Sequence, residues 1–130
     1  MPDEMTAEEF VAMQAKPKRN KMNAKRTQYN GHWYDSKAEA SYAASLDMLA
    51  ACGDIDCWLR QVPIDLGADA RYTVDFLVHD KAGLRAVEVK GQEREGFRRN
   101  VKLWRKHGPF PLHIVKRGRT TEIVEGASRA

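Results

Sequence analysis

The sequence predicts a mixed α/β domain in which helices flank a sheet, with the order helix, three strands, helix, strand. Three observations predict it. Two apolar, β-branched runs at 71–79 and 84–90 are separated by a short turn, as in a hairpin. A capped helical pattern precedes them at 36–51, and a basic helical pattern follows at 95–107. A chain of 130 residues has room for one core and a tail.

The start of the chain predicts a basic arm, at 1–26, in front of a domain at 27–125. A short helix is expected from Thr6. Residues 16–26 hold six lysines or arginines and no acid, a composition typical of a flexible segment. We therefore expect this arm to follow a polyanion and to fold on binding it.

The first elements of the domain have clear local signals. The Asn-Gly pair at 30–31 favours the positive φ values of a type I′ turn and predicts a tight hairpin. Ser36-Lys37-Ala38-Glu39 is a capping box that opens a helix running to about residue 51. A glycine at 53 ends that helix, and a strand is expected at 55–64.

The last elements complete the sheet. The helix at 95–107 is expected to end at Gly108-Pro109, through a C′ glycine followed by a proline. A core strand is expected at 111–116 and a short strand at 121–124. Cys52 and Cys57 match no common zinc spacing and are expected to be reduced packing residues.

Composition narrows the function classes. The chain is 42% hydrophobic and 31% charged, which is ordinary for a globular protein. No window approaches the ~18 apolar residues of a transmembrane helix, so no membrane partner is expected. Met1-Pro2-Asp3-Glu4 lacks the basic start and apolar stretch of a secretory signal. We expect a cytoplasmic protein.

The positive charge is clustered. The formal net charge is +4, and basic residues gather at 16–26, at 94–106 and at 116–119. Separate basic clusters favour a polyanion partner, most often nucleic acid. The alternative for any one cluster is a solvated helix face or a tail.

Asp75 lies in the middle of an apolar strand pattern. Alternation puts Tyr72, Val74, Phe76 and Val78 on one face and Asp75 on the other. A carboxylate there is costly to bury unless it is paired or binds a metal. A half-exposed strand with a wet face explains it equally well.

Glu88 and Lys90 strengthen the case for a site. They are two apart on the next strand and project together, while Val87 and Val89 face the other way. An ion pair on a solvated sheet is the alternative. With Asp75 across the hairpin, however, two carboxylates and an ammonium converge. Phosphodiester hydrolysis needs carboxylate oxygens to hold a hard cation and an ammonium beside the attacking water.

Glu39 is a further candidate acid. It falls at helical spacing with Tyr42, Leu46 and Leu49, on the face that must pack against the sheet. A carboxylate in the first turn of that face would overlook the two strands. Its place in the capping box gives it a structural explanation of equal weight.

These residues resemble the PD-(D/E)xK nuclease superfamily, and within it the small phage-borne nucleases of the junction-resolving endonuclease I type. The resemblance covers about residues 27–116 and includes the order of the elements. The segments that carry it are Tyr72–Leu77, Val87–Gly91, Ser36–Ala40 and Gln61–Pro63. In this chain Val74 stands where the motif has proline, a residue that supplies no ligand.

The resemblance implies a restriction-endonuclease-like sheet core and a set of site residues. Asp75 and Glu88 match the metal-binding acids, with the main-chain carbonyl of Val89 as a further ligand. Lys90 matches the catalytic lysine. Glu39 matches the acid from the first helix, which binds a second metal or a metal-bound water. The implied cofactor is Mg²⁺ or Mn²⁺, with no organic cofactor.

DNA is the expected partner. The residues expected to neutralise its phosphates are Arg98, Arg99, Lys102, Arg105 and Lys106 on the second helix, with Lys25 and Arg26 of the arm. The chain is thus expected to be a metal-dependent DNA endonuclease, selective for branched DNA such as a four-way junction if it belongs to the resolving branch. Paired cuts would require a homodimer, and phage origin would place the enzyme in the host cytoplasm. The alternative is a catalytically silent DNA-binding module.

Overall fold

The computed structural model describes residues 26–67, 69–90 and 96–127. The helix expected from Thr6 and the arm at 16–25 lie outside this part. The elements are β1 (Thr27–Tyr29), β2 (His32–Tyr34), α2 (Lys37–Cys52), β3 (Cys57–Asp65), β4 (Arg71–Asp80), β5 (Gly83–Val89), α3 (Phe97–His107), β6 (Leu112–Lys116) and β7 (Arg119–Val124). The expected order of helices and strands is confirmed.

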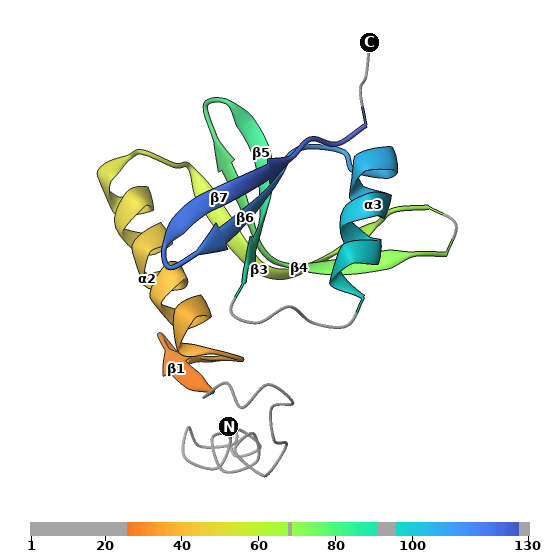
Figure 1. Ribbon diagram of the computed structural model, residues 1–130. Coiled ribbons are helices and arrows are strands. Elements are labelled where there is room, and N and C mark those ends of the chain that lie inside the picture. The colour runs from red at the N-terminus through yellow and green to blue at the C-terminus, as the bar shows by residue number, and fades with distance from the viewer. Residues whose placement is uncertain (1–25, 68, 91–95, 128–130) are drawn as a thin grey trace, which may run out of the picture.

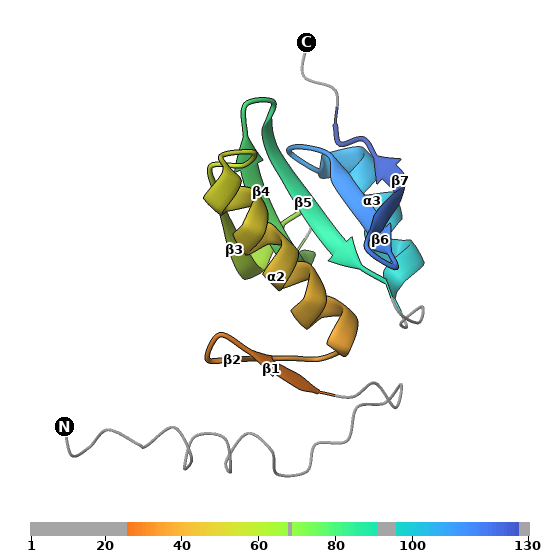
Figure 2. The ribbon, with the colours of Figure 1, turned by 90° about the vertical axis from the view of Figure 1, so that its left-hand side faces the viewer.

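One five-stranded mixed sheet forms the centre of the molecule. Its strand order is β3-β4-β5-β6-β7. Strands β5 and β6 are parallel and the other neighbours are antiparallel. The two helices cover opposite faces of this sheet, α2 on one side and α3 on the other (Figures 1 and 2). The chain is therefore a layered α/β domain, with the β1–β2 hairpin against the start of α2.

Each face of the sheet has its own core. On the α2 side, Leu46 packs with Val87, Val89 and Phe76. On the α3 side, the fully buried Trp104 packs with residues of the central strands and of the β7 edge strand. The alternation along β5 divides the two cores, because Val87 faces α2 while Ala86 faces α3.

The local signals of the first elements are confirmed. Asn30 and Gly31 have φ values of 51° and 81°, as a type I′ turn requires. The Ser36 side chain caps α2 by accepting a hydrogen bond from the Glu39 main-chain N–H at 3.1 Å. Gly53 ends the helix in the left-handed region at φ 83°.

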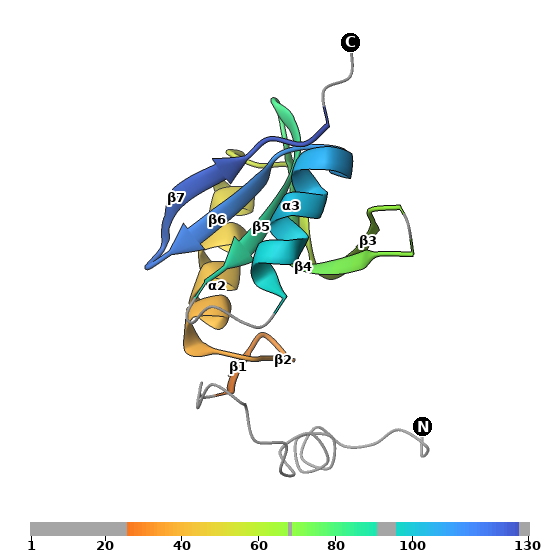
Figure 3. The ribbon, with the colours of Figure 1, turned by 45° about the vertical axis from the view of Figure 1, so that its right-hand side comes forward.

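Strand β4 does not present one apolar face, so that expectation is wrong. Phe76 and Val78 pack in the α2 core, but Tyr72 and Val74 pack in the α3 core. The first half of β4 pairs with β3 beyond the end of the β4–β5 ladder, and there the two strands project from the sheet as a two-stranded ribbon (Figure 3). A paired strand twists more strongly when only one neighbour holds it.

Two smaller expectations are corrected. Helix α3 ends before Gly108 as predicted, but that glycine is extended, at φ −63°, and not left-handed. Glycine is needed there because a Cβ atom would lie 2.5 Å from the indole ring of Trp104. Cys52 and Cys57 are free thiols, yet both are exposed and neither fills the core. Among the described residues, no helix is long and apolar enough to span a bilayer.

Candidate functional site

Asp75 lies where β4 and β5 separate. The ladder between the two strands runs from the Asp80–Gly83 pair to the Phe76–Val87 pair. One residue further, the Asp75 Oδ2 atom accepts a hydrogen bond from the Val89 main-chain N–H at 2.8 Å. The carboxylate therefore takes the place of a main-chain carbonyl at the end of the ladder. It is buried, with 8% of the residue exposed.

The same register places oxygen atoms of β5 beside Asp75. Continuing the ladder by one pair puts Glu88 opposite Asp75. The Val89 N–H points to β4, and a residue in a strand directs its N–H and its C=O to the same side. The Val89 carbonyl therefore also points into the gap between the strands. Lys90 alternates with it and donates its N–H to the Val115 carbonyl of β6 at 2.8 Å.

The Lys90 side chain lies on the α3 side of the sheet. Its Nζ atom is 5.1 Å from the ring centroid of Phe97, in the first turn of α3. This is a cation–π contact, which restricts the lysine to the neighbourhood of the helix start. Glu88 shares this face by strand alternation, and its Oε1 atom is buried. The structure thus brings Asp75, Glu88 and Lys90 to one end of the central strands.

Glu39 is buried on the other helix. It is 2% exposed in the first turn of α2, on the inward-facing stripe that the sequence predicted. Figures 1 and 2 show that this end of α2 and the C-terminal end of β5 lie at the same end of the molecule. Within the described ranges, however, no group of three or more His, Cys, Asp or Glu side chains could hold a metal ion. The role of Glu39 at the site stays a prediction.

Without Glu39, the oxygen atoms at the end of the β4–β5 ladder suit a hard divalent cation. Two carboxylates and one main-chain carbonyl form an oxygen donor set of the kind that Mg²⁺ and Mn²⁺ accept, with water completing the coordination. Asp75, Glu88 and Val89 supply these donors from adjacent strands. Chemically, the arrangement can bind a cation beside a lysine and place both against a phosphate.

The predicted basic helix is exposed where DNA would need it. Its basic side chains Arg98, Arg99, Lys102, Arg105 and Lys106 are all exposed. Arg105 lies 3.5 Å from the Glu122 carboxylate, but both side chains are more than half exposed. Such surface pairs contribute little to stability. Because Phe97 contacts Lys90, this basic surface begins at the candidate site.

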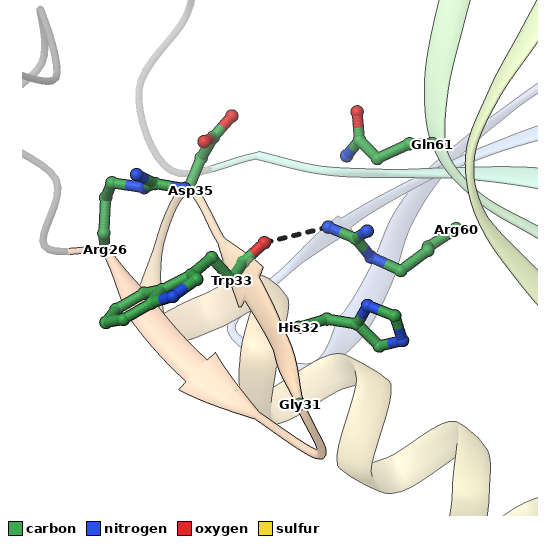
Figure 4. Close-up of a pocket in the computed structure, with 7 residues that line it drawn as sticks. All are labelled: Arg26, Gly31, His32, Trp33, Asp35, Arg60 and Gln61. Carbon is green, nitrogen blue, oxygen red and sulfur yellow. Dashed lines mark hydrogen bonds between the residues drawn. The ribbon is translucent and has the colours of Figure 1, made fainter. Parts of the chain in front are cut away.

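A polar pocket lies between the β1–β2 hairpin and β3 (Figure 4). Its volume is about 260 Å³. The hairpin and its flanks contribute Arg26, Gly31, His32, Trp33 and Asp35, and β3 contributes Arg60 and Gln61. Arg26, which the sequence assigned to DNA, is thus found at this pocket; Lys25 lies outside the described residues.

Arg60 connects β3 to the hairpin. Its Nη2 atom donates to the Trp33 carbonyl at 2.8 Å, and its guanidinium lies 4.7 Å from the Tyr34 ring centroid. Burial raises the pKa of the Tyr34 hydroxyl, the positive charge of Arg60 opposes this, and the Glu39 charge adds to the increase. Tyr34 therefore lies within electrostatic range of both the pocket and Glu39.

Sequence reasoning did not find this pocket. Arg60 and Gln61 lie in a strand pattern, and neither residue suggested a site on its own. The pocket depends on the docking of the hairpin on β3, a contact between segments 27 residues apart. The signals that the sequence offers in this region are the Gln61-Val62-Pro63 segment of the family resemblance and the assignment of Arg26 to DNA.

Comparison with known proteins gives no match: no family model, no characterised protein and no solved structure is significantly similar to this chain.

Proposed function

We propose that the chain is a Mg²⁺- or Mn²⁺-dependent DNA endonuclease with the restriction-endonuclease-like core of the PD-(D/E)xK superfamily. One observation carries this proposal. Asp75 accepts a hydrogen bond from the Val89 N–H at the point where β4 and β5 separate. The strand register puts Asp75 opposite Glu88, and Lys90 follows Val89 directly. The strand register and the alternation along β5 put a second carboxylate and a lysine near this buried carboxylate.

Each residue has a chemical task in this proposal. Asp75, Glu88 and the Val89 carbonyl would hold the cation, which when bound would supply positive charge for the phosphate and a more acidic water. Lys90 orients the attacking water or donates a hydrogen bond from its ammonium to a phosphate oxygen, and contact with Phe97 limits its motion. The burial of Asp75 lowers the local dielectric, so these charges act on the substrate more strongly than in water.

The basic face of α3 supplies the affinity for DNA. Exposed arginine and lysine side chains release counterions from the phosphates that they contact. Because α3 starts beside Lys90, a duplex that lies along the helix passes the proposed site. These contacts read the backbone and carry no base sequence, so selectivity for DNA shape is the expected form of specificity.

A second function rests on the exposed basic residues of α3 alone. A catalytically silent DNA-binding module would need only the basic surface. It would bind DNA without cleaving it, and substitutions at Lys90 would not matter.

Cleavage of labelled DNA distinguishes these functions. A four-way junction, the matched linear duplex and the single strand are incubated with Mg²⁺, Mn²⁺ or EDTA, beside a Lys90→Ala variant. Metal-dependent cutting that the variant lacks supports the endonuclease, and the preferred substrate identifies junction selectivity. A folded protein that binds all three DNAs and cuts none contradicts the proposal and leaves the silent module.

A further inference from the structure

We propose that the pocket between the β1–β2 hairpin and β3 binds a DNA phosphodiester near the one that is cut, on the same strand. This inference rests on the proposed nuclease function and extends it to a second contact with the substrate. The residues that carry it are Arg60, Gln61, His32 and Arg26. In Figure 4 the guanidinium of Arg60 and the amide of Gln61 project from β3 toward the space in front of the hairpin.

The charge of the pocket suits a phosphate. Two guanidinium groups, of Arg26 and Arg60, line it against one carboxylate, of Asp35, and the imidazole ring of His32 adds a further polar group. Arginine binds phosphate well because its planar fork offers several N–H donors. Metal ligands of the candidate site lie on other strands, so this pocket is a separate contact.

Arg60 is held ready for an anion. One of its donors is used on the Trp33 carbonyl, and the Tyr34 ring supports the guanidinium from below. These contacts fix the guanidinium in place, so an anion in the pocket meets donors that are already ordered.

Gln61 places the pocket one strand from the candidate metal site. The β3–β4 register pairs Arg60 with Phe76 and Val62 with Val74, so Gln61 lies opposite Asp75. Opposing residues of neighbouring strands have Cα atoms about 5 Å apart. Arg60 lies opposite Phe76 on the α2 face, whereas Lys90 lies on the α3 face. A DNA strand whose scissile phosphate meets Asp75 must therefore pass around the β3 edge of the sheet to bring a neighbouring phosphate to this pocket.

The backbone of Gln61 supports a functional role. Its φ is 50°, a left-handed conformation inside a strand. For a residue other than glycine this conformation is strained, and such residues concentrate at binding sites. The conformation turns the side chain out of the regular alternation, which brings the amide into the pocket lining.

Salt-dependent DNA binding tests the inference without cleavage. Fluorescence anisotropy of a labelled duplex and a four-way junction is measured in EDTA over a series of salt concentrations. We expect Arg60→Gln to reduce the slope of log K against log salt by about 1, the effect of one lost phosphate contact. Lys81→Gln removes the same charge from the exposed β4–β5 turn and should leave the slope unchanged.

Gln61→Gly keeps the inference testable if loss of Arg60 releases the hairpin. Glycine adopts the left-handed conformation freely, so the variant should be at least as stable as the wild type by its Tm. Its DNA affinity should fall about two- to tenfold, the range for one hydrogen bond. A stable Gln61→Gly variant with unchanged affinity overturns the inference, as does a folded Arg60→Gln variant with an unchanged slope.

The outcomes separate this inference from the proposed function. If the wild type never cuts DNA but Arg60→Gln lowers the slope, the phosphate contact stands and the nuclease fails. If metal-dependent cutting is found and both variants bind normally, the nuclease stands and the pocket fails. If the variants change only the thermal stabilisation by inorganic phosphate, the pocket takes a free anion, and the DNA contact is overturned.

Discussion

Strand β4 carries two aspartates whose carboxylates do opposite things at the two ends of the β4–β5 ladder. At the turn, the Asp80 carboxylate accepts the Ala82 N–H at 2.8 Å and pairs with the Arg85 guanidinium. At the other end, Asp75 accepts the Val89 N–H, and the strands then separate. The first aspartate closes a hairpin, whereas the second stands at an opening.

The neighbours of each carboxylate explain the difference. The hydrogen bond from Arg85 lowers the pKa of Asp80, so the carboxylate stays ionised and pairs with the guanidinium. Beside Asp75 the register brings a second carboxylate, of Glu88, and the Lys90 ammonium follows on the α3 side. Two acids with one lysine suit a bound cation better than a simple ion pair. The role of an aspartate in a strand therefore depends on which charged groups lie beside it at the end of the ladder.

The largest effect should come from removing the carboxylate at the open end of the ladder, Asp75. We expect Asp75→Ala to lose Mn²⁺ binding, measured by titration calorimetry, and to lower cleavage by about 10³-fold or more, because several kcal/mol of charge stabilisation disappear. Asp80→Ala, on the same strand, is the matched control and should keep both. Cleavage retained by Asp75→Ala would contradict the site assignment.

Lys90→Ala should separate chemistry from binding. We expect turnover to fall by about 10²–10⁴-fold, the usual contribution of a positioned acid or base. Metal-dependent DNA binding by anisotropy should remain, since the carboxylates are intact. Lys81→Ala at the exposed turn serves as the control. A Lys90→Ala variant that cuts at the wild-type rate would favour the silent module.

Glu39→Gln asks whether the α2 side contributes to the open end. The helix cap should persist, because the Ser36 side chain accepts from the main-chain N–H of residue 39, which the substitution leaves in place. If Glu39 completes the site, cleavage should fall by about 10–100-fold, as for other residues that support metal ligands. The measurement is the cleavage rate across a Mg²⁺ series at unchanged Tm. An unchanged rate would assign Glu39 to the α2 core alone.

The smallest effect concerns the closed end. The folded-state pKa of Asp80 lies below its usual value of about 3.9, chiefly through the Arg85 hydrogen bond. The pair therefore stabilises the fold above that pH, and its contribution is lost as pH falls through the folded pKa. We expect Asp80→Asn to reduce the free energy of unfolding at neutral pH by about 0.2–1 kcal/mol. Urea titrations at pH 7 and pH 3 should show the difference between variant and wild type shrinking in acid; an equal difference at both pH values would contradict this.

Local signals predicted the elements well. The Asn30-Gly31 turn, the Ser36 cap and the Gly53 stop each act within a few residues, so neighbouring chemistry suffices. The end of α3 was placed correctly, yet for another reason: Gly108 lets Trp104 approach, which is a packing requirement. The pairing of Asp75 with the Glu88 strand could also be predicted, because a short hairpin sets its own register.

The sequence by itself determined the order of the elements, the charged face of α3 and the three charged residues on the central hairpin. It could do so because strand and helix periods assign side chains to faces. Only the tertiary structure decided where β4 leaves β5, which divides its apolar side chains between two cores and puts Asp75 at the opening. It also decided the pocket of Arg60 and Gln61, because that pocket needs the hairpin to dock on β3. Long-range contacts of this kind arise from packing across layers, and no local period in the chain encodes them.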